Sequence, residues 1–334
     1  MTKRETWVEW RRAHCPKKSR KERRIKAKFS KKAVSVVGKL LMLASLVFIV
    51  LQITRHDVDF SILASPFVIV GLLATALAFG LGIVFAGLNF RWLIANITGV
   101  SVGRALVVKA YCVSNLYKYL PGSVMYLIGR NRIAFETKKV SHAQVAFATV
   151  MEGVLILLAT VIVIAVSVSD EAIYYVRQVD IPSFVWIVAG GIVLVCALLA
   201  VVFRRRMGEW FGKFSNGMRN FRPLSRIKRL GTCLLIVIVL AVTYIVALML
   251  LGQRITPDMV PTIIGLYLLA WLAGFMTPGA GGGMGVREFV LYMFLGGFLD
   301  PGIVLSSAIM HRLITIVGDV FAYGFVLVYS GARK

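Results

Sequence analysis

Long apolar segments separated by short basic blocks run through the chain after residue 32. A helix needs about 20 apolar residues to cross the hydrocarbon core of a bilayer, which is about 30 Å thick. Six segments meet this requirement, at residues 33–53, 66–90, 142–167, 182–203, 230–251 and 301–329. Hydrophobic residues make up 58% of the chain and charged residues only 16%, against about a quarter in soluble domains. The sequence therefore predicts an all-α polytopic membrane protein with six transmembrane helices.

Two further apolar segments differ from these six. Residues 102–135 and 259–298 each contain a Pro-Gly pair and several charged side chains, so neither is expected to form one continuous spanning helix. We interpret both as re-entrant hairpins, in which a broken helix enters the membrane and returns to the same side.

The basic residues test the orientation of this arrangement, because short cytoplasmic loops carry an excess of Lys and Arg. With a cytoplasmic N-terminus and two re-entrant hairpins, 34 of the 39 Lys and Arg residues fall on the cytoplasmic side. We therefore expect both termini in the cytoplasm of a prokaryote and the protein in its cytoplasmic (inner) membrane. Residues 1–32 form a basic tail that we expect to lie against anionic headgroups.

A formal net charge of +24 could indicate nucleic-acid binding if the basic residues covered a soluble face. Here they lie in blocks between apolar segments, so we expect no nucleic-acid partner. The four cysteines have no CxxC spacing and the four histidines are far apart. We therefore expect neither a metal nor another cofactor.

The two Pro-Gly segments share a pattern. In both, an arginine follows the proline by nine residues, and Pro121 and Arg130 lie 157 positions before Pro278 and Arg287. Each segment follows two predicted crossings and precedes a third. The transmembrane domain, residues 33–330, is thus predicted to consist of two repeats at about 33–167 and 182–330, the second inverted relative to the first. Inverted repeats with broken helices are typical of transporters whose substrate site lies near the membrane midplane.

Several ionisable residues lie within the predicted membrane segments, where a charge is costly unless it faces a cavity or a partner. Glu152 is ten residues into its crossing, and therefore close to the midplane. His311, Arg312 and Asp319 lie in the last crossing. These four residues form either a proton relay or internal ion pairs, and the sequence leaves both interpretations open.

The glycine-rich run at 278–285 has neither the spacing of a dinucleotide-binding loop nor the Lys-Ser/Thr of a P-loop. Its glycines suit the tip of a re-entrant segment, where the backbone must turn sharply. The chain also contains no nucleophile elbow, HExxH or paired-carboxylate motif. We therefore do not expect an enzyme.

Three features of the sequence resemble the flippase-like family that includes the transmembrane region of lysylphosphatidylglycerol synthase. They are the segment Lys118-Tyr119-Leu120-Pro121-Gly122-Ser123, the later Glu152, and the segment from Thr277 to Glu288. The resemblance covers about residues 33–330. It implies a domain that moves a lipid between leaflets, often an anionic or aminoacylated phospholipid or a polyprenyl-linked sugar. The synthase's soluble aminoacyl-transfer domain has no counterpart in this sequence, so lipid synthesis is not expected.

Our leading hypothesis is the flipping of an anionic phospholipid or polyprenyl-linked glycan, with Arg130 and Arg287 holding the headgroup. The alternatives are a membrane scaffold that positions a glycosyltransferase or lipid-modifying enzyme, and a transporter of a small soluble anion. The predicted substrate contacts all lie in the two hairpins: Lys118, Tyr119, Pro121, Gly122, Arg130, Pro278, Gly279, Gly281, Arg287 and Glu288.

Overall fold

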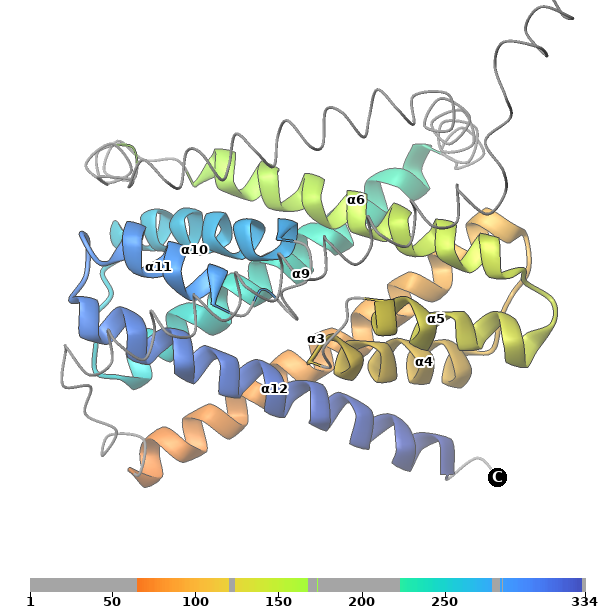
Figure 1. The fold of residues 1–334 in the computed structure, drawn as a ribbon, viewed down its shortest axis with the longest axis horizontal. Coiled ribbons are helices and arrows are strands. Elements are labelled where there is room, and N and C mark those ends of the chain that lie inside the picture. The colour runs from red at the N-terminus through yellow and green to blue at the C-terminus, as the bar shows by residue number, and fades with distance from the viewer. Residues whose placement is uncertain are drawn as a thin grey trace, which may run out of the picture.

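The computed structural model describes residues 65–119, 124–167, 173, 223–277, 283 and 285–331. Within these ranges the chain is helical and contains no strand (Figure 1). The elements in chain order are α3 (Pro66–Thr98), α4 (Arg104–Leu116), the short 3-10 helix η2 (Tyr117–Tyr119), α5 (Val124–Thr137), α6 (His142–Val166), α9 (Pro223–Leu250), α10 (Met259–Met276), α11 (Val286–Leu295) and α12 (Pro301–Gly331).

Five of these helices are long and apolar enough to cross a membrane, at Pro66–Thr98, His142–Val166, Ile227–Leu250, Met259–Met276 and Pro301–Tyr329. Four of them coincide with predicted crossings, and the protein is a multi-pass helical membrane protein. The predicted crossings at 33–53 and 182–203, and the tail at 1–32, lie outside the described residues. The fifth helix, α10, was predicted as the first half of a hairpin. The count of six crossings and two re-entrant hairpins therefore stays a prediction.

Local signals set where the helices begin and end. Pro66 starts α3, where its missing N–H costs nothing, and α3 ends at Gly99, which adopts the left-handed conformation at φ +69°. The α6 helix begins with a capping box, in which the Ser141 hydroxyl accepts from the Gln144 N–H and the Gln144 side chain accepts from the Ser141 N–H.

Both Pro-Gly segments are interrupted, as predicted. The first forms α4 and α5, which pack against each other, and the second forms α10 and α11, which do the same (Figure 1). Glycine permits both contacts. A methyl group added at Gly129 of α5 would lie 2.9 Å from the Ser114 Cα, and one added at Gly283 would lie 2.9 Å from the Gly274 Cα of α10.

The long helices α3 and α12 cross at a pair of glycines. A methyl group at Gly80 would lie 2.6 Å from the Gly318 carbonyl oxygen, and one at Gly318 would lie 2.6 Å from the Ala76 carbonyl oxygen. Small residues let helix backbones approach closely, which is the usual source of helix association in lipid. The crossing therefore depends on both glycines.

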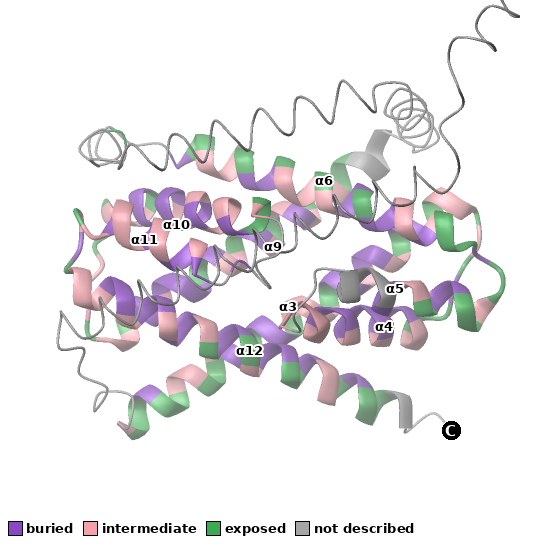
Figure 2. Ribbon diagram, in the orientation of Figure 1, coloured by how far each residue is buried: buried purple, intermediate pink, exposed green. Residues whose placement is uncertain are grey.

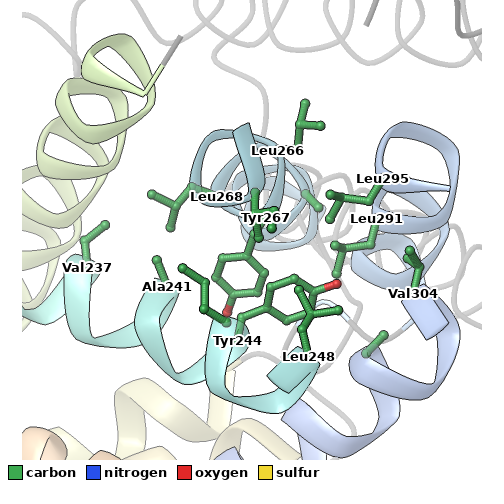
Figure 3. Packing of buried hydrophobic residues seen from close by; sticks show 14 of the residues in the cluster. Val237, Ala241, Tyr244, Leu248, Leu266, Tyr267, Leu268, Leu291, Leu295 and Val304 are labelled. Carbon is green, nitrogen blue, oxygen red and sulfur yellow. The ribbon is translucent and has the colours of Figure 1, made fainter. Parts of the chain in front are cut away.

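The buried core has two main parts. One is formed by apolar side chains of α9, α10, α11 and α12, together with Ala159 of α6. The rings of Tyr244 and Tyr267 are stacked within it, with their centroids 4.5 Å apart (Figure 3). The other is formed by α3, α4, α5 and α6. The long helices carry large apolar side chains on their surfaces, such as Phe67 and Val166, which are 75% and 81% exposed. Exposed positions recur along these helices (Figure 2). A lipid-facing surface has this character.

The described helices form two halves, α3–α6 and α9–α12, whose packing follows the same pattern. Helices α3, α4, α5 and α6 correspond in order to α9, α10, α11 and α12, and the starts of α3 and α9, Pro66 and Pro223, are 157 positions apart. Under this correspondence, each substantial packing between two described helices has a counterpart: α3 with α12 matches α9 with α6, and α4 with α12 matches α10 with α6. Whether the second unit is inverted stays a prediction.

Candidate functional site

A cavity of about 660 Å³ lies between the two halves. Most of its wall is apolar and comes from α3, α9 and α10. The polar and charged part of the wall comes from α4, η2, α6, α11 and α12. Its members are Tyr111, Asn115, Lys118, Tyr119, Thr149, Glu152, Arg287, Arg312 and Thr315.

On the α11 and α12 side, Arg312 and Glu288 form a two-point ion pair. Arg312 Nε and Nη2 lie 2.5 and 3.1 Å from the two Glu288 carboxylate oxygens. Glu288 also accepts the Gly285 N–H at 2.8 Å, which caps the start of α11. A carboxylate at this position both caps the helix and faces its positive end. Glu288 is therefore held in place by Arg312 of α12 and by the backbone at the start of its own helix, α11.

Arg287 precedes this carboxylate and lies on the cavity wall. Its Nε is 3.4 Å from Glu288 Oε1, and its Nη2 is 3.4 Å from His311 Nδ1. Gly274 packs beside it and against Gly283, because a methyl group at Gly274 would lie 3.1 Å from the Arg287 Cβ and 3.3 Å from the Gly283 Cα. The close glycine contact leaves room for the arginine between the end of α10 and the start of α11.

We assign the tautomer of His311 from its contacts. The Thr243 hydroxyl donates to the Leu240 carbonyl at 2.7 Å and lies 3.0 Å from His311 Nε2, so we place the ring proton on Nε2, with the Tyr267 hydroxyl 3.4 Å from the same nitrogen. With the proton on Nε2, Nδ1 is free to accept from Arg287. In this assignment His311 is a buried, neutral ring whose Nδ1 faces the Arg287 guanidinium.

Arg130 lies behind the cavity wall and is fully buried. It forms an ion pair with Glu152 of α6, and both side chains are almost inaccessible. Its guanidinium carbon lies 4.5 Å from the Phe90 ring centroid and 4.4 Å from the Tyr111 ring centroid, so the cation is stacked against two aromatic rings. Glu152 itself reaches the cavity.

A third ion pair connects the end of the α4 segment to α12. Lys118 Nζ lies 2.6 Å from Asp319 Oδ2, and the Tyr119 hydroxyl donates to the same oxygen at 2.7 Å. The Lys118 side chain is 29% exposed, whereas Asp319 is completely buried. Asp319 Oδ1 has no hydrogen-bond partner among the described residues.

The predicted substrate contacts are thus divided by the structure. Lys118, Tyr119 and Arg287 line the cavity, whereas Arg130 and Glu288 lie behind its wall. Of the predicted relay or ion-pair residues, Glu152 and Arg312 line the cavity, and all except His311 form ion pairs. The roles assigned to these residues stay predictions. Five predicted contacts lie outside the described residues: Pro121, Gly122, Pro278, Gly279 and Gly281.

Sequence reasoning missed several residues of the cavity. Asn115, Thr149 and Thr315 belong to its polar part, and Trp271 and Phe275 stack at 5.2 Å in its apolar part. The Trp271–Phe275 spacing of four residues places both rings on one face of a helix, which is the signal that could have indicated them. The single hydroxyl and amide side chains carry no comparable pattern.

A comparison with protein families matches residues 33–322 to the family described as the lysylphosphatidylglycerol synthase TM region. The matched range contains every described helix before α12, the first 22 residues of α12, and every charged residue of the cavity. A comparison with curated proteins gives no match.

Proposed function

The chain belongs to the family of the lysylphosphatidylglycerol synthase transmembrane region, and we propose that it moves an anionic lipid between the leaflets of the cytoplasmic membrane. The lipid is a phospholipid or a polyprenyl-linked glycan. In this proposal the chain is a transporter and not an enzyme, its partner is the lipid itself, and both termini face the cytoplasm of a prokaryote.

One observation carries the proposal: a single cavity joins a cluster of cationic side chains to an apolar wall that reaches the surface. Lys118, Arg287 and Arg312 supply the cations. The apolar wall includes side chains that line the cavity and are also exposed on the helix surfaces, namely Leu81, Phe85, Leu235 and Phe275. A small soluble anion would need the cations but not this wall. An amphiphile with an anionic headgroup and acyl chains uses both.

The packing symmetry supports a transport cycle. The cavity lies where the two halves meet, and the six crossings with two re-entrant hairpins that we infer would form an inverted repeat around it. In transporters of this architecture one half rocks against the other around a fixed site. The sequence contains no nucleotide-binding motif, so lipid movement is downhill, ion-coupled, or driven by metabolism of the lipid on one side.

The test is a lipid-scrambling assay in proteoliposomes that contain a trace of fluorescent phosphatidylglycerol, with quenching of the outer leaflet by a membrane-impermeant reductant. We expect the wild-type protein to expose inner-leaflet lipid, and Arg287→Gln to slow this movement at least tenfold, since about 1.4 kcal/mol of lost headgroup interaction is a factor of ten.

Arg132→Gln is the matched control, because Arg132 lies on α5 outside the cavity and its side chain is 55% exposed. It should transport like the wild type. Equal rates in protein-free liposomes and in wild-type proteoliposomes would refute the proposal and favour a scaffold for a lipid-modifying enzyme or glycosyltransferase.

A further inference from the structure

The charged residues around the cavity do not balance. Those that line it, or form an ion pair with a lining residue, comprise four cations and three carboxylates among the described residues. The cations are Lys118, Arg130, Arg287 and Arg312, and the carboxylates are Glu152, Glu288 and Asp319. His311 adds no charge because its Nδ1 accepts a hydrogen bond. The set therefore carries one positive charge in excess.

Each carboxylate already has a close cationic partner. Glu152 is paired with Arg130, which is fully buried and stacked between Phe90 and Tyr111. The Glu288 carboxylate is bound at two points by Arg312. Asp319 accepts from Lys118 at 2.6 Å. Asp319 Oδ1 has no partner among the described residues, but it belongs to a completely buried carboxylate that does not line the cavity. An incoming amine would therefore reach any of these carboxylates only by breaking an ion pair that is at least partly buried.

Arg287 is the cation left over. Its Nε lies 3.4 Å from Glu288 Oε1 and its Nη2 lies 3.4 Å from His311 Nδ1, whereas each of the other three cations lies within 2.6 Å of a carboxylate oxygen. The Arg287 Nε has no hydrogen-bond partner among the described residues. It is 94% buried by the surrounding protein and lies on the cavity wall. A buried charge in a low-dielectric environment is costly without a counter-ion, so the cavity favours a ligand that supplies one.

From this balance we infer that the cavity selects lipids whose headgroup contains one phosphodiester and no amine. The inference rests on the proposed function and gives its substrate class. A phosphodiester supplies the one negative charge that the set lacks, and the planar guanidinium of Arg287 matches two phosphate oxygens. An aminoacylated or zwitterionic headgroup brings an ammonium group for which the described wall has no unpaired carboxylate.

Two kinds of lipid share this chemistry: a glycerophospholipid with an uncharged alcohol headgroup, and a polyprenyl phosphate carrying an uncharged sugar. The same proteoliposome assay separates them. Fluorescent lipids of four classes are compared in otherwise identical vesicles: phosphatidylglycerol, a hexosyl phosphoryl polyprenol, zwitterionic phosphatidylethanolamine and cationic lysylphosphatidylglycerol.

We expect one or both of the phosphodiester lipids without an amine to move at least tenfold faster than the two lipids that carry one. The faster of the two identifies the source of the headgroup. Faster or equal movement of lysylphosphatidylglycerol would overturn the inference while leaving lipid transport intact. Movement of none of the four would overturn the proposed function itself.

Substitutions at Arg287 test the charge balance directly. Arg287→Gln removes the excess charge, so it should slow the phosphodiester lipids and reduce the preference over phosphatidylethanolamine to less than about threefold. Arg287→Lys keeps the charge and should retain a preference of at least tenfold, even with a lower rate. An unchanged preference in Arg287→Gln, in protein that elutes as a single species like the wild type, would contradict the inference.

Discussion

At the scale of single residues, the pair of Arg130 and Glu152 shows why ionisable side chains persist within a hydrophobic bundle. Their side chains are 1% and 3% exposed, and the arginine is also covered by Phe90 and Tyr111. Removing one partner of such a pair leaves an uncompensated buried charge, whereas removing both together can be nearly neutral.

Glu152→Gln should therefore reduce the free energy of unfolding by about 3–5 kcal/mol. The measurement is reversible denaturation in mixed detergent micelles. The double substitution Arg130→Met with Glu152→Gln should recover much of this loss, because no buried charge then remains unpaired.

Glu136→Gln is the matched control. Glu136 pairs with Arg132 on the same helix, but their side chains are 36% and 55% exposed, so its loss should cost less than about 1 kcal/mol. Equal costs for Glu152→Gln and Glu136→Gln would mean that the buried pair contributes no more than a surface pair.

The residues of this pair could be singled out from the sequence, but their partnership could not. The sequence places Glu152 and Arg130 as charges within apolar segments, and internal ion pairing of Glu152 is one of the two interpretations that it leaves open. Lys118 and Asp319 lie 201 positions apart in the chain, and no sequence periodicity connects them. Such pairings depend on tertiary packing, which single-sequence patterns do not encode.

At the scale of helices, the crossing of α3 and α12 depends on backbone contact. Gly318→Ala places a methyl group 2.6 Å from the Ala76 carbonyl oxygen, a backbone atom that cannot rotate away. Overpacking of this kind typically costs about 1–3 kcal/mol. We therefore expect Gly318→Ala to lower the thermal unfolding temperature in detergent by several degrees.

Gly324→Ala provides the control on the same helix, because a methyl group at Gly324 would meet no atom within 4 Å. Alanine is the better helix former, so this substitution should leave the unfolding temperature unchanged or raise it. If Gly318→Ala behaved like Gly324→Ala, the close crossing of α3 and α12 would be incorrect.

The helices themselves were largely predictable, because long apolar runs and Pro-Gly interruptions are strong local signals. The four described crossings lie on α3, α6, α9 and α12, and both interrupted segments form pairs of packed helices. The sequence did not predict that α10 is long and apolar enough to span a membrane, because its 18 residues were assigned to a hairpin from the proline and charges that follow them. A stretch of this length is at the lower limit for a crossing, so length does not decide the assignment.

At the scale of the whole molecule, the symmetric packing of α3–α6 and α9–α12 has a consequence for topology. If the second unit is inverted, corresponding connections in the two halves must lie on opposite sides of the membrane. The connection between α5 and α6 contains Lys139, and the corresponding connection between α11 and α12 contains Gly297. Both residues are exposed, and our orientation places Lys139 in the cytoplasm and Gly297 outside.

Single cysteines at these two positions test the inversion. The background is the chain with its four cysteines replaced by serine or alanine. With a membrane-impermeant maleimide added to intact cells, Gly297→Cys should be labelled and Lys139→Cys should not. After permeabilisation both should be labelled, which serves as the control for reactivity. Labelling of both in intact cells would place the two connections on the same side of the membrane, and the two units would then be parallel. In that case the cavity would still lie between two related halves, but a rocking exchange of its access between leaflets would no longer follow from the symmetry of the fold.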